Sequence, residues 1–568
     1  MSDDFWTGRG TPWEFDAGPA ASLRWSSLFA ATPNYRALGV ARTGKELFRW
    51  HYGPMFYRGR LDPGTVKVLV IGQEGAQDES LAHRSFVGGT GGRLQYLLSQ
   101  LGITHSYLFL NTFVYPIFGQ YDATLKPLAQ GATSPIVKHR QSIFDYAAEI
   151  NDLHLVIAVG QAAQDSVKTW QSLRSGPIGP KTRVVGVMHP GAAAAGAATA
   201  VIASFKAAIK KIAGFAKADP SWLPPDPGAT RGFDTPFRYR SAPIPFVDLP
   251  LGIAWRLGNG GTSSNRRDGQ RGIQLFSDDG KYNNAGATLS YPALDGDKEG
   301  FEQDAGDLPY EPPRAHPRDF DAGPGNAWAK LLMGGEPGLA WPDFAALGLA
   351  GHPSFGWGPV YRGRPDNASV VVLADQTSHD DLFMCRALCG EAGQRLQRWL
   401  AAAGLTQRYF ILRTLPVDSL TTPAAKVSAA LANPAVVALY SEAMKRLTSA
   451  KALVTVGPNA AQQAARINAR HLPVVGLPAH GSSGWAGQWQ AALSTLNGAH
   501  VPTDQAPSGS FDGGRGQIAR IDLPFGMLRW EGTSGDRAAQ AKRSGKPSRD
   551  YLKIMMPLWA SQLQPEPL

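Results

Sequence analysis

The sequence predicts an α/β protein in which a parallel sheet flanked by helices occurs twice, as a tandem duplication, with a basic loop-rich appendage after each copy. Three observations predict this fold. Short continuous apolar runs alternate with segments of helical periodicity. The same short segments return in the second half of the chain. The length of 568 residues also exceeds the roughly 250–300 residues at which a single core stops growing.

The repeated segments define the domain organisation. They are FDAGP (15–19 and 320–324), YRGR (57–60 and 361–364), the ungapped match of 91–112 with 393–414, AVGQAAQ (158–164) with TVGPNAAQ (455–462), VVG (184–186 and 474–476), and DLPLG (248–252) with DLPFG (522–526). Between the copies, a segment that is acidic and Pro-rich without apolar periodicity is typical of a linker. We therefore interpret the chain as a first α/β domain (1–218), its appendage (219–294), the linker (295–317), a second α/β domain (318–499) and a second appendage (500–568).

In the first copy, four apolar runs predict strands buried on both faces, as in parallel sheets. The predicted strands are Val66–Ile71, Tyr107–Asn111, Leu155–Val159 and Arg183–Met188. Apolar residues at helical spacing predict helices after the first and the last of these strands. These residues are Leu94, Leu97, Leu98 and Leu101 for one helix, and Val201, Phe205, Ile209 and Ile212 for the other.

Composition excludes several classes of protein. The chain has no apolar stretch of eighteen residues and no basic and apolar leader at its start, so we expect neither a membrane span nor a secretory signal, and a cytoplasmic location. Its two cysteines, Cys385 and Cys389, are too few for a disulfide framework, a four-thiolate zinc site or an iron–sulfur cluster. At i, i+4 they are typical of ordinary apolar helix residues. The net charge of +10 is compatible with a polyanionic partner and also with an ordinary protein of this length.

Residues suited to chemistry follow three of the predicted strands. Gly72-Gln73-Glu74-Gly75-Ala76-Gln77-Asp78 comes after the first strand, Asn111 ends the second, and His189-Pro190-Gly191 follows the fourth. Ligands of parallel sheets bind at the carboxyl ends of the strands. The sequence therefore predicts that an acid, an amide and an imidazole converge on one edge of the sheet.

The segments IGQEGAQDE, RSFVGGTGGRL, YLFLN, AVGQAA and VMHPG, in this order, resemble the uracil-DNA glycosylase superfamily, over roughly 66–215. The Phe-Val-Gly and Gly-rich segment is most similar to the iron–sulfur branch. Two departures are the absence of the four cluster cysteines and an HPG in place of the usual HPS. The resemblance implies a DNA glycosylase that acts on a base flipped out of a duplex. Because the cluster is structural in that branch, we expect an enzyme with no metal and no organic cofactor.

Glycosidic bond cleavage needs a carboxylate beside the sugar and a hydrogen-bond donor beside the departing base, because charge develops at both places. The resemblance gives the first role to Glu74, with Asp78 in reserve. A surface carboxylate at a strand end is the alternative. The resemblance gives the role of hydrogen-bond donor to His189, acting as a neutral imidazole. A histidine outside such a motif is more often structural.

The resemblance also implies a pocket for the flipped base. Phe86 would stack on the base and Asn111 would read its edge. Gln73, Gly75 and Ala76 would line the same pocket. The alternatives are that Phe86 belongs to the core and that Asn111 forms a strand-end turn.

Several further residues are candidates for DNA contacts. Gly88, Gly89, Gly91 and Gly92 precede a predicted helix, whose first amides are suited to a phosphate. A nucleotide-cofactor loop is the competing interpretation, but no GxxxxGK[ST] occurs and we expect no nucleotide cofactor. Lys206 and Lys210, with Arg238 and Arg240 of the first appendage, add positive charge, although such arginines are equally typical of a solvated loop. The Ala-rich segment after His189 offers no intercalating wedge.

The second copy lacks the predicted site residues. Alignment replaces Glu74 with Thr377, Phe86 with Leu388 and Asn111 with Arg413, while His480 lies within one residue of the His189 position. We interpret this copy as catalytically silent, with a structural or DNA-docking role, because no other residue type replaces a carboxylate next to the sugar.

Ala76 bears on the substrate. Uracil-selective members of the superfamily place there a Tyr that excludes substituents on pyrimidine C5, so Ala76 favours a modified pyrimidine, such as the glucosylated 5-hydroxymethylcytosine of bacteriophage DNA. A role in defence against phages follows from that interpretation. The alternatives are a uracil repair glycosylase and a non-catalytic DNA-binding scaffold. An unrelated hydrolase lacks support because no GxSxG elbow occurs, and the sequence indicates no oligomeric state.

Overall fold

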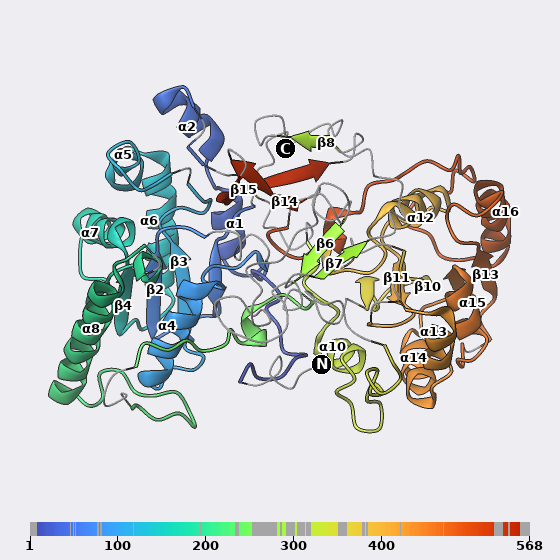
Figure 1. Ribbon diagram of the computed structural model, residues 1–568, viewed down its shortest axis with the longest axis horizontal. Coiled ribbons are helices and arrows are strands. Elements are labelled where there is room, and N and C mark those ends of the chain that lie inside the picture. The colour runs from blue at the N-terminus through green and yellow to red at the C-terminus, as the bar shows by residue number, and fades with distance from the viewer. Residues whose placement is uncertain are drawn as a thin grey trace.

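The computed structural model contains two five-stranded sheets, each flanked by helices, at opposite ends of the long axis of the molecule (Figure 1). It describes the chain apart from residues 1–7, 46, 49, 51–52, 76–78, 80–81, 118, 194, 233–237, 253–280, 285–286, 291–300, 304–312, 314–319, 350–359, 378–380, 382–383, 418, 421, 470, 528–537, 544–545 and 557–568. Side chains are not described for the strands within 281–303 and 538–556.

The first sheet has the strand order β1-β3-β2-β4-β5. Its strands are β1 (Tyr57–Gly59), β2 (Val68–Gly72), β3 (Tyr107–Asn111), β4 (Leu155–Val159) and β5 (Arg183–Val187). All four predicted strands are therefore confirmed, and they are parallel to one another. The expectation that all four are buried on both faces is wrong for β5, an edge strand in which Arg183 and Gly186 are exposed. The sheet is not purely parallel, however, because β1 pairs with β3 in the antiparallel direction. Its three residues are too few to form a recognisable apolar run.

Helices cover both faces of this sheet. They are α1 (Trp25–Ala30), α2 (Tyr35–Thr43), α4 (Gly89–Gln100), α5 (Lys126–Gln130), α6 (Pro135–Glu149), α7 (Gln161–Leu173) and α8 (Ala198–Ala218). The apolar residues of α1, α6 and α7 pack on one face of the sheet, and those of α4 and α8 pack on the other. The helices predicted from the Leu94 and Val201 patterns are α4 and α8, and both are confirmed.

The second sheet repeats the first in strand order and direction, as β9-β11-β10-β12-β13. Its strands are β9 (Tyr361–Gly363), β10 (Val370–Ala374), β11 (Tyr409–Arg413), β12 (Ala452–Val456) and β13 (Val474–Leu477). Its helices are α10 (Asn326–Leu332), α12 (Glu391–Ala402), α13 (Ala424–Leu431), α14 (Pro434–Arg446), α15 (Pro458–Ala464) and α16 (Trp485–Gly498).

The strand registers correct the alignment of the two copies. Gly72 pairs with Asn111 at the end of β2, and Ala374 pairs with Arg413 at the end of β10. Counting on from Gly72 and Ala374, the counterpart of Glu74 is Gln376 and not Thr377. The sequence alignment was shifted by one residue here, because no identical residue fixes the register after the strand.

The cysteine environment also differs from expectation. Cys385 and Cys389 are buried and free, but they lie in the loop before α12 rather than in a helix, and Cys385 has a left-handed φ of 55°. The i, i+4 spacing was therefore a coincidence of loop sequence.

An aspartate in each appendage contacts the sheet of its own domain. In the first, Asp248 forms ion pairs with Arg58 and Arg60 of the β1 segment and accepts a hydrogen bond from Tyr107. In the second, Asp522 accepts equivalent contacts from Arg362 at 2.8 Å and Tyr409 at 2.7 Å. Short strands complete the appendage and linker segments: β6 (Lys281–Asn284), β7 (Ala287–Ser290), β8 (Phe301–Gln303), β14 (Ala538–Arg543) and β15 (Lys546–Met556).

The two halves exchange segments at their junction. Phe320 and Phe525, from the second half, are buried in the core of the first sheet. Leu251, from the first appendage, is buried in the core of the second sheet, with Phe15 packed against it. The DLPLG and DLPFG repeats thus hold the two domains together.

A search of the described helices for a segment long and apolar enough to cross a membrane found none.

Candidate active site

The carboxyl ends of β2 and β3 bring a ring and an amide together. A Cβ at Gly72 would lie 2.3 Å from Cζ of Phe86 and 2.8 Å from Oδ1 of Asn111. Only glycine leaves room for both side chains at this place. The predicted stacking residue and the predicted base-reading residue therefore both approach the end of β2. Phe86 is also part of the apolar core between the sheet and α4, as its alternative interpretation expected.

The Phe86 loop is held in a strained conformation. Phe86 has a φ of 57°, which is uncommon for a residue with a bulky side chain. Oε1 of the buried Glu79 accepts hydrogen bonds from the amides of Val87 and Gly88, both at 2.9 Å. A Cβ at Gly91 would lie 1.6 Å from the carbonyl oxygen of Phe86, so the first turn of α4 packs directly on this loop. Such strain persists where the surroundings fix it, and it is frequent at functional sites.

Asn111 is oriented by a short chain of hydrogen bonds. Its Nδ2 donates to Oγ of Ser85 at 3.1 Å, and Ser85 donates to the carbonyl of Met55 at 3.0 Å. No described group donates to Oδ1 of Asn111. An oxygen in this state can accept from the N3–H of uracil or from the exocyclic amino group of cytosine.

His189 is set up to donate from Nε2. The Gly191 amide donates to Nδ1 of the imidazole at 3.1 Å, so the proton of the neutral ring resides on Nε2. The surrounding protein atoms lower the pKa of His189 by desolvation, against an opposing effect of the Glu79 carboxylate. The ring is thus neutral at pH 7 and keeps one N–H for an acceptor outside the protein.

Glu74 and Gln73 are half-buried just beyond the end of β2. The Phe113 amide donates to the carbonyl of Gln73 at 2.9 Å, which continues the β2–β3 pairing past the strand end. Gly75 is packed too closely for a side chain, since a Cβ there would lie 2.1 Å from Sδ of Met55. Ala76 and Asp78 lie outside the described residues.

The glycines predicted to bind a phosphate are mostly buried and contact other parts of the protein. Gly88, Gly91 and Gly92 are buried, and the Gly88 amide is already bonded to Glu79. Gly89, at the start of α4, is half-buried. Packing against the Phe86 loop therefore accounts for part of the Gly-rich run.

The basic candidates lie on an exposed surface of the same domain. Lys206 and Lys210 are exposed on α8. Arg238 and Arg240 are exposed on either side of Tyr239, whose ring packs on Phe205 of α8 at 5.3 Å between centroids. The first appendage is therefore anchored to the helix that carries the two lysines.

In the second domain the corresponding edge is closed by its own side chains. Arg413 donates to Oε1 of Gln376 at 3.0 Å, so the counterparts of Asn111 and Glu74 bind each other. His480 pairs with Glu391 at 3.3 Å, and the counterpart of His189 by strand register is Ala479. His480 is thus one residue away, as predicted.

A carboxylate does exist one position earlier in the second domain. Asp375, the counterpart of Gln73, accepts from the amides of Asn459 at 3.1 Å and Ala460 at 2.7 Å at the start of α15. Burial raises its pKa to about 6. These two hydrogen bonds hold the Asp375 carboxylate against the first residues of α15.

Glu79 is the residue that sequence reasoning missed. Its counterpart Asp381 accepts from the Cys389 amide at 2.9 Å, so an acid holds this loop in both domains. The signal was present in the alignment, where an acid stands eight residues before Val87 and before Cys389.

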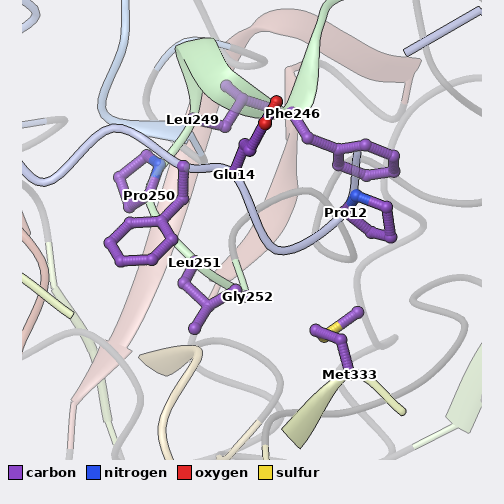
Figure 2. A pocket seen from close by; sticks show the side chains of 9 residues that line it. Pro12, Glu14, Phe246, Leu249, Pro250, Leu251, Gly252 and Met333 are labelled. Carbon is purple, nitrogen blue, oxygen red and sulfur yellow. The ribbon is translucent and has the colours of Figure 1, made fainter. Parts of the chain in front are cut away.

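A separate pocket lies at the junction of the two halves. Figure 2 shows the residues around it, which are Pro12 and Glu14 of the N-terminal segment, Phe246, Leu249, Pro250, Leu251 and Gly252 of the first appendage, and Met333. It shares no lining residue with the edge that holds Phe86, Asn111 and His189.

An aromatic ring, an amide, a neutral imidazole and an acid are groups that cleavage of a bond to a planar base would use, and here they follow the strand ends of one sheet. In agreement, residues 58–213 match the family model described as the uracil DNA glycosylase superfamily. Residues 58–213 of the first domain thus belong to a superfamily of glycosylase-type hydrolases that act on DNA. A search of curated proteins found no match.

The iron–sulfur cluster of the branch that the motifs resemble does not fit this chain. Both cysteines belong to the second domain, outside residues 58–213, and a cluster of that kind needs four thiolates.

Proposed function

We propose that the protein is a DNA glycosylase that flips a modified pyrimidine out of a duplex and hydrolyses its N-glycosidic bond, leaving an abasic site. The observation that carries this proposal is the close approach of both Phe86 and Asn111 to Gly72, on the edge where His189 presents Nε2–H. A ring, an acceptor and a donor are together what a flipped base requires.

The chemistry assigns one role to each residue. As the bond from the sugar C1′ to the base nitrogen breaks, its electron pair leaves with the base and the sugar becomes cationic. The Glu74 carboxylate stabilises that cation and orients a water, whose oxygen bonds to C1′ and whose proton is released. His189 donates a hydrogen bond to the developing negative charge on the base oxygen.

The second domain is proposed to be a duplicated and silent copy. The shared strand order and the paired aspartates of the appendages support duplication. The bond between Arg413 and Gln376 supports silence, because it fills the place where a base would be read.

The base itself is proposed to carry a C5 substituent, with glucosylated 5-hydroxymethylcytosine of phage DNA as one example and phage defence as the role. Support comes from the sequence alone, where Ala76 replaces a bulky residue. Uracil, in a repair role, is the second candidate, since Asn111 Oδ1 can also accept from N3–H.

The test is base release from duplexes that carry uracil, 5-hydroxymethylcytosine or its glucosylated form, followed by alkali to cleave at abasic sites. We expect Glu74→Gln and His189→Ala each to lower the rate by about 10²–10⁴-fold. DNA affinity should persist, since phosphate contacts supply most non-specific binding.

Gln376→Ala and His480→Ala are the matched controls in the second domain, and both should leave the rate unchanged. Loss of activity in His480→Ala with full activity in His189→Ala would reverse the assignment of the working domain. Binding without release from any of the duplexes would identify a scaffold instead.

A further inference from the structure

Arg140, on α6, is a buried cation with unused hydrogen-bond donors. The residue is 3% exposed, and none of its guanidinium nitrogens has an acceptor among the described residues. The groups that act on its charge are the phenols of Tyr35 and Tyr121, which are not anions at neutral pH. Burial lowers the pKa of Arg140 to about 10, so the side chain still carries its charge at pH 7.

A lone buried cation is costly to the fold, because it loses its hydration without gaining a counter-charge. The nearest compensation is the Phe144 ring, whose centroid is 5.8 Å from the guanidinium carbon. Packing alone does not require a cation here. On α14 of the second domain, a neutral residue reaches the equivalent strand end: Tyr440 donates to the carbonyl of Arg413, the counterpart of Asn111.

Arg140 lines a recess that shares Asn111 with the proposed base pocket. Asn111 and Thr112, at the end of β3, form one wall, and aromatic side chains including Tyr35 and Phe144 form others. Two other polar groups of the recess are already engaged, since Thr112 donates to the Gly72 carbonyl at 2.8 Å and Nε2 of His139 contacts the Leu28 carbonyl at 2.6 Å. Oδ1 of Asn111 has no donor among the described residues. The recess has room for about one water-sized group.

We propose that this recess is a subsite for the first oxygen atom of a substituent on pyrimidine C5, with Arg140 as the donor to it. This inference rests on the proposed function. C5 is bonded to C4, whose substituent Asn111 would read, so a substituent on C5 would lie beside Asn111, which also lines the recess. A hydroxymethyl group supplies one oxygen of the right size.

The test compares 5-hydroxymethylcytosine with 5-methylcytosine, which has the same carbon at C5 and lacks the oxygen, in otherwise identical duplexes. The whole protein should release 5-hydroxymethylcytosine at least about 10-fold faster, because hydrogen bonds to charged groups contribute about 1.5–3 kcal/mol. Arg140→Met keeps the length and apolar character of the side chain and should abolish that ratio. Lys138→Met, an exposed position on the same helix, is the control and should preserve it.

Thermal unfolding separates a binding residue from a structural one. Since Arg140→Met removes an uncompensated buried charge, we expect its Tm to rise by about 2–4 °C. A lower Tm with equal loss on all substrates, or an unchanged ratio of the two release rates, would overturn the subsite. Release of uracil alone would also overturn it and leave the glycosylase standing, whereas no release from any duplex would reject the proposed function itself.

Discussion

Glu79 and His189 show how single residues can be coupled at the site. The Glu79 carboxylate holds the amides of Val87 and Gly88 and also acts on the imidazole, which it favours in the protonated form. Desolvation acts in the opposite direction and prevails, so the pKa of His189 lies below its ordinary value of 6.5. The Glu79 carboxylate thus influences both the loop that carries Phe86 and the proposed donor His189.

We expect Glu79→Gln to lower the pKa of His189 further, because the charge is lost while a carbonyl oxygen remains to accept from the loop amides. NMR titration of the His189 ring, assigned by its absence in His189→Ala, measures this. Asp381→Asn, the equivalent change in the second domain, should leave the titration in place. An upward shift in Glu79→Gln would contradict the electrostatic assignment.

The same depressed pKa affects stability. Below pH 6.5 the unfolded chain binds a proton at this histidine before the folded protein does, so stability falls as the pH drops toward the folded pKa and is regained above 6.5. Replacing Glu79 by Gln should extend this window to lower pH.

At the level of elements, the contact between α4 and the preceding loop fixes the position of Phe86. Gly91 and Gly393 hold the same place in the two domains, where a Cβ would lie 1.6 Å from the Phe86 carbonyl and 1.7 Å from the Leu388 carbonyl. Both loops also share the left-handed φ, at 57° and 54°. The loop conformation and the glycine packed on it are therefore common to both copies. Only the side chain on the loop differs, which is Phe86 in the first domain and Leu388 in the second.

Gly91→Ala should displace Phe86 and lower base release by at least about 10-fold, since small misplacements at a reacting group have large effects on rate. Gly393→Ala forces the same clash in the second domain. It should lower the unfolding free energy to a similar extent and spare base release. Chemical denaturation and the alkali assay are the measurements for both variants. An equal loss of activity in the two variants would refute the assignment of catalysis to the first domain alone.

Over the whole molecule, the exchanged segments make each domain depend on the other. Phe525 is 2% exposed, and its ring lies 5.2 Å from that of Phe320 and 6.0 Å from that of Phe29 in the first domain. Arg84 donates to the Phe525 carbonyl at 3.1 Å, and Arg386 donates to the Leu251 carbonyl at 2.9 Å. The exchange is thus reciprocal.

Phe525→Ala should destabilise the first domain by about 3–5 kcal/mol, although the residue is distant from that domain in sequence. Amide hydrogen exchange of β2, β3 and β4 reports this loss. Phe511→Ala, which removes a ring packed on Trp489 in the second domain, is the matched change and should leave those strands protected. Faster exchange confined to β10 and β12 in Phe525→Ala would show that the junction does not couple the domains.

The sequence by itself determined the strands, the repeated segments and which polar residues follow the strand ends. Short continuous apolar runs rich in β-branched residues favour buried strands, and polar residues placed directly after them share an edge when the strands are parallel. Phe86, Asn111 and His189 were therefore predictable from motif order and strand ends. Only the tertiary structure decided which residues from other segments contact these residues. The clamp formed by Glu79, the correspondence of Glu74 with Gln376, the lone charge of Arg140 and the exchange of Phe525 all depend on contacts between segments whose spacing carries no local pattern. Burial and register are properties of packed elements, which the order of residues along a single segment does not contain.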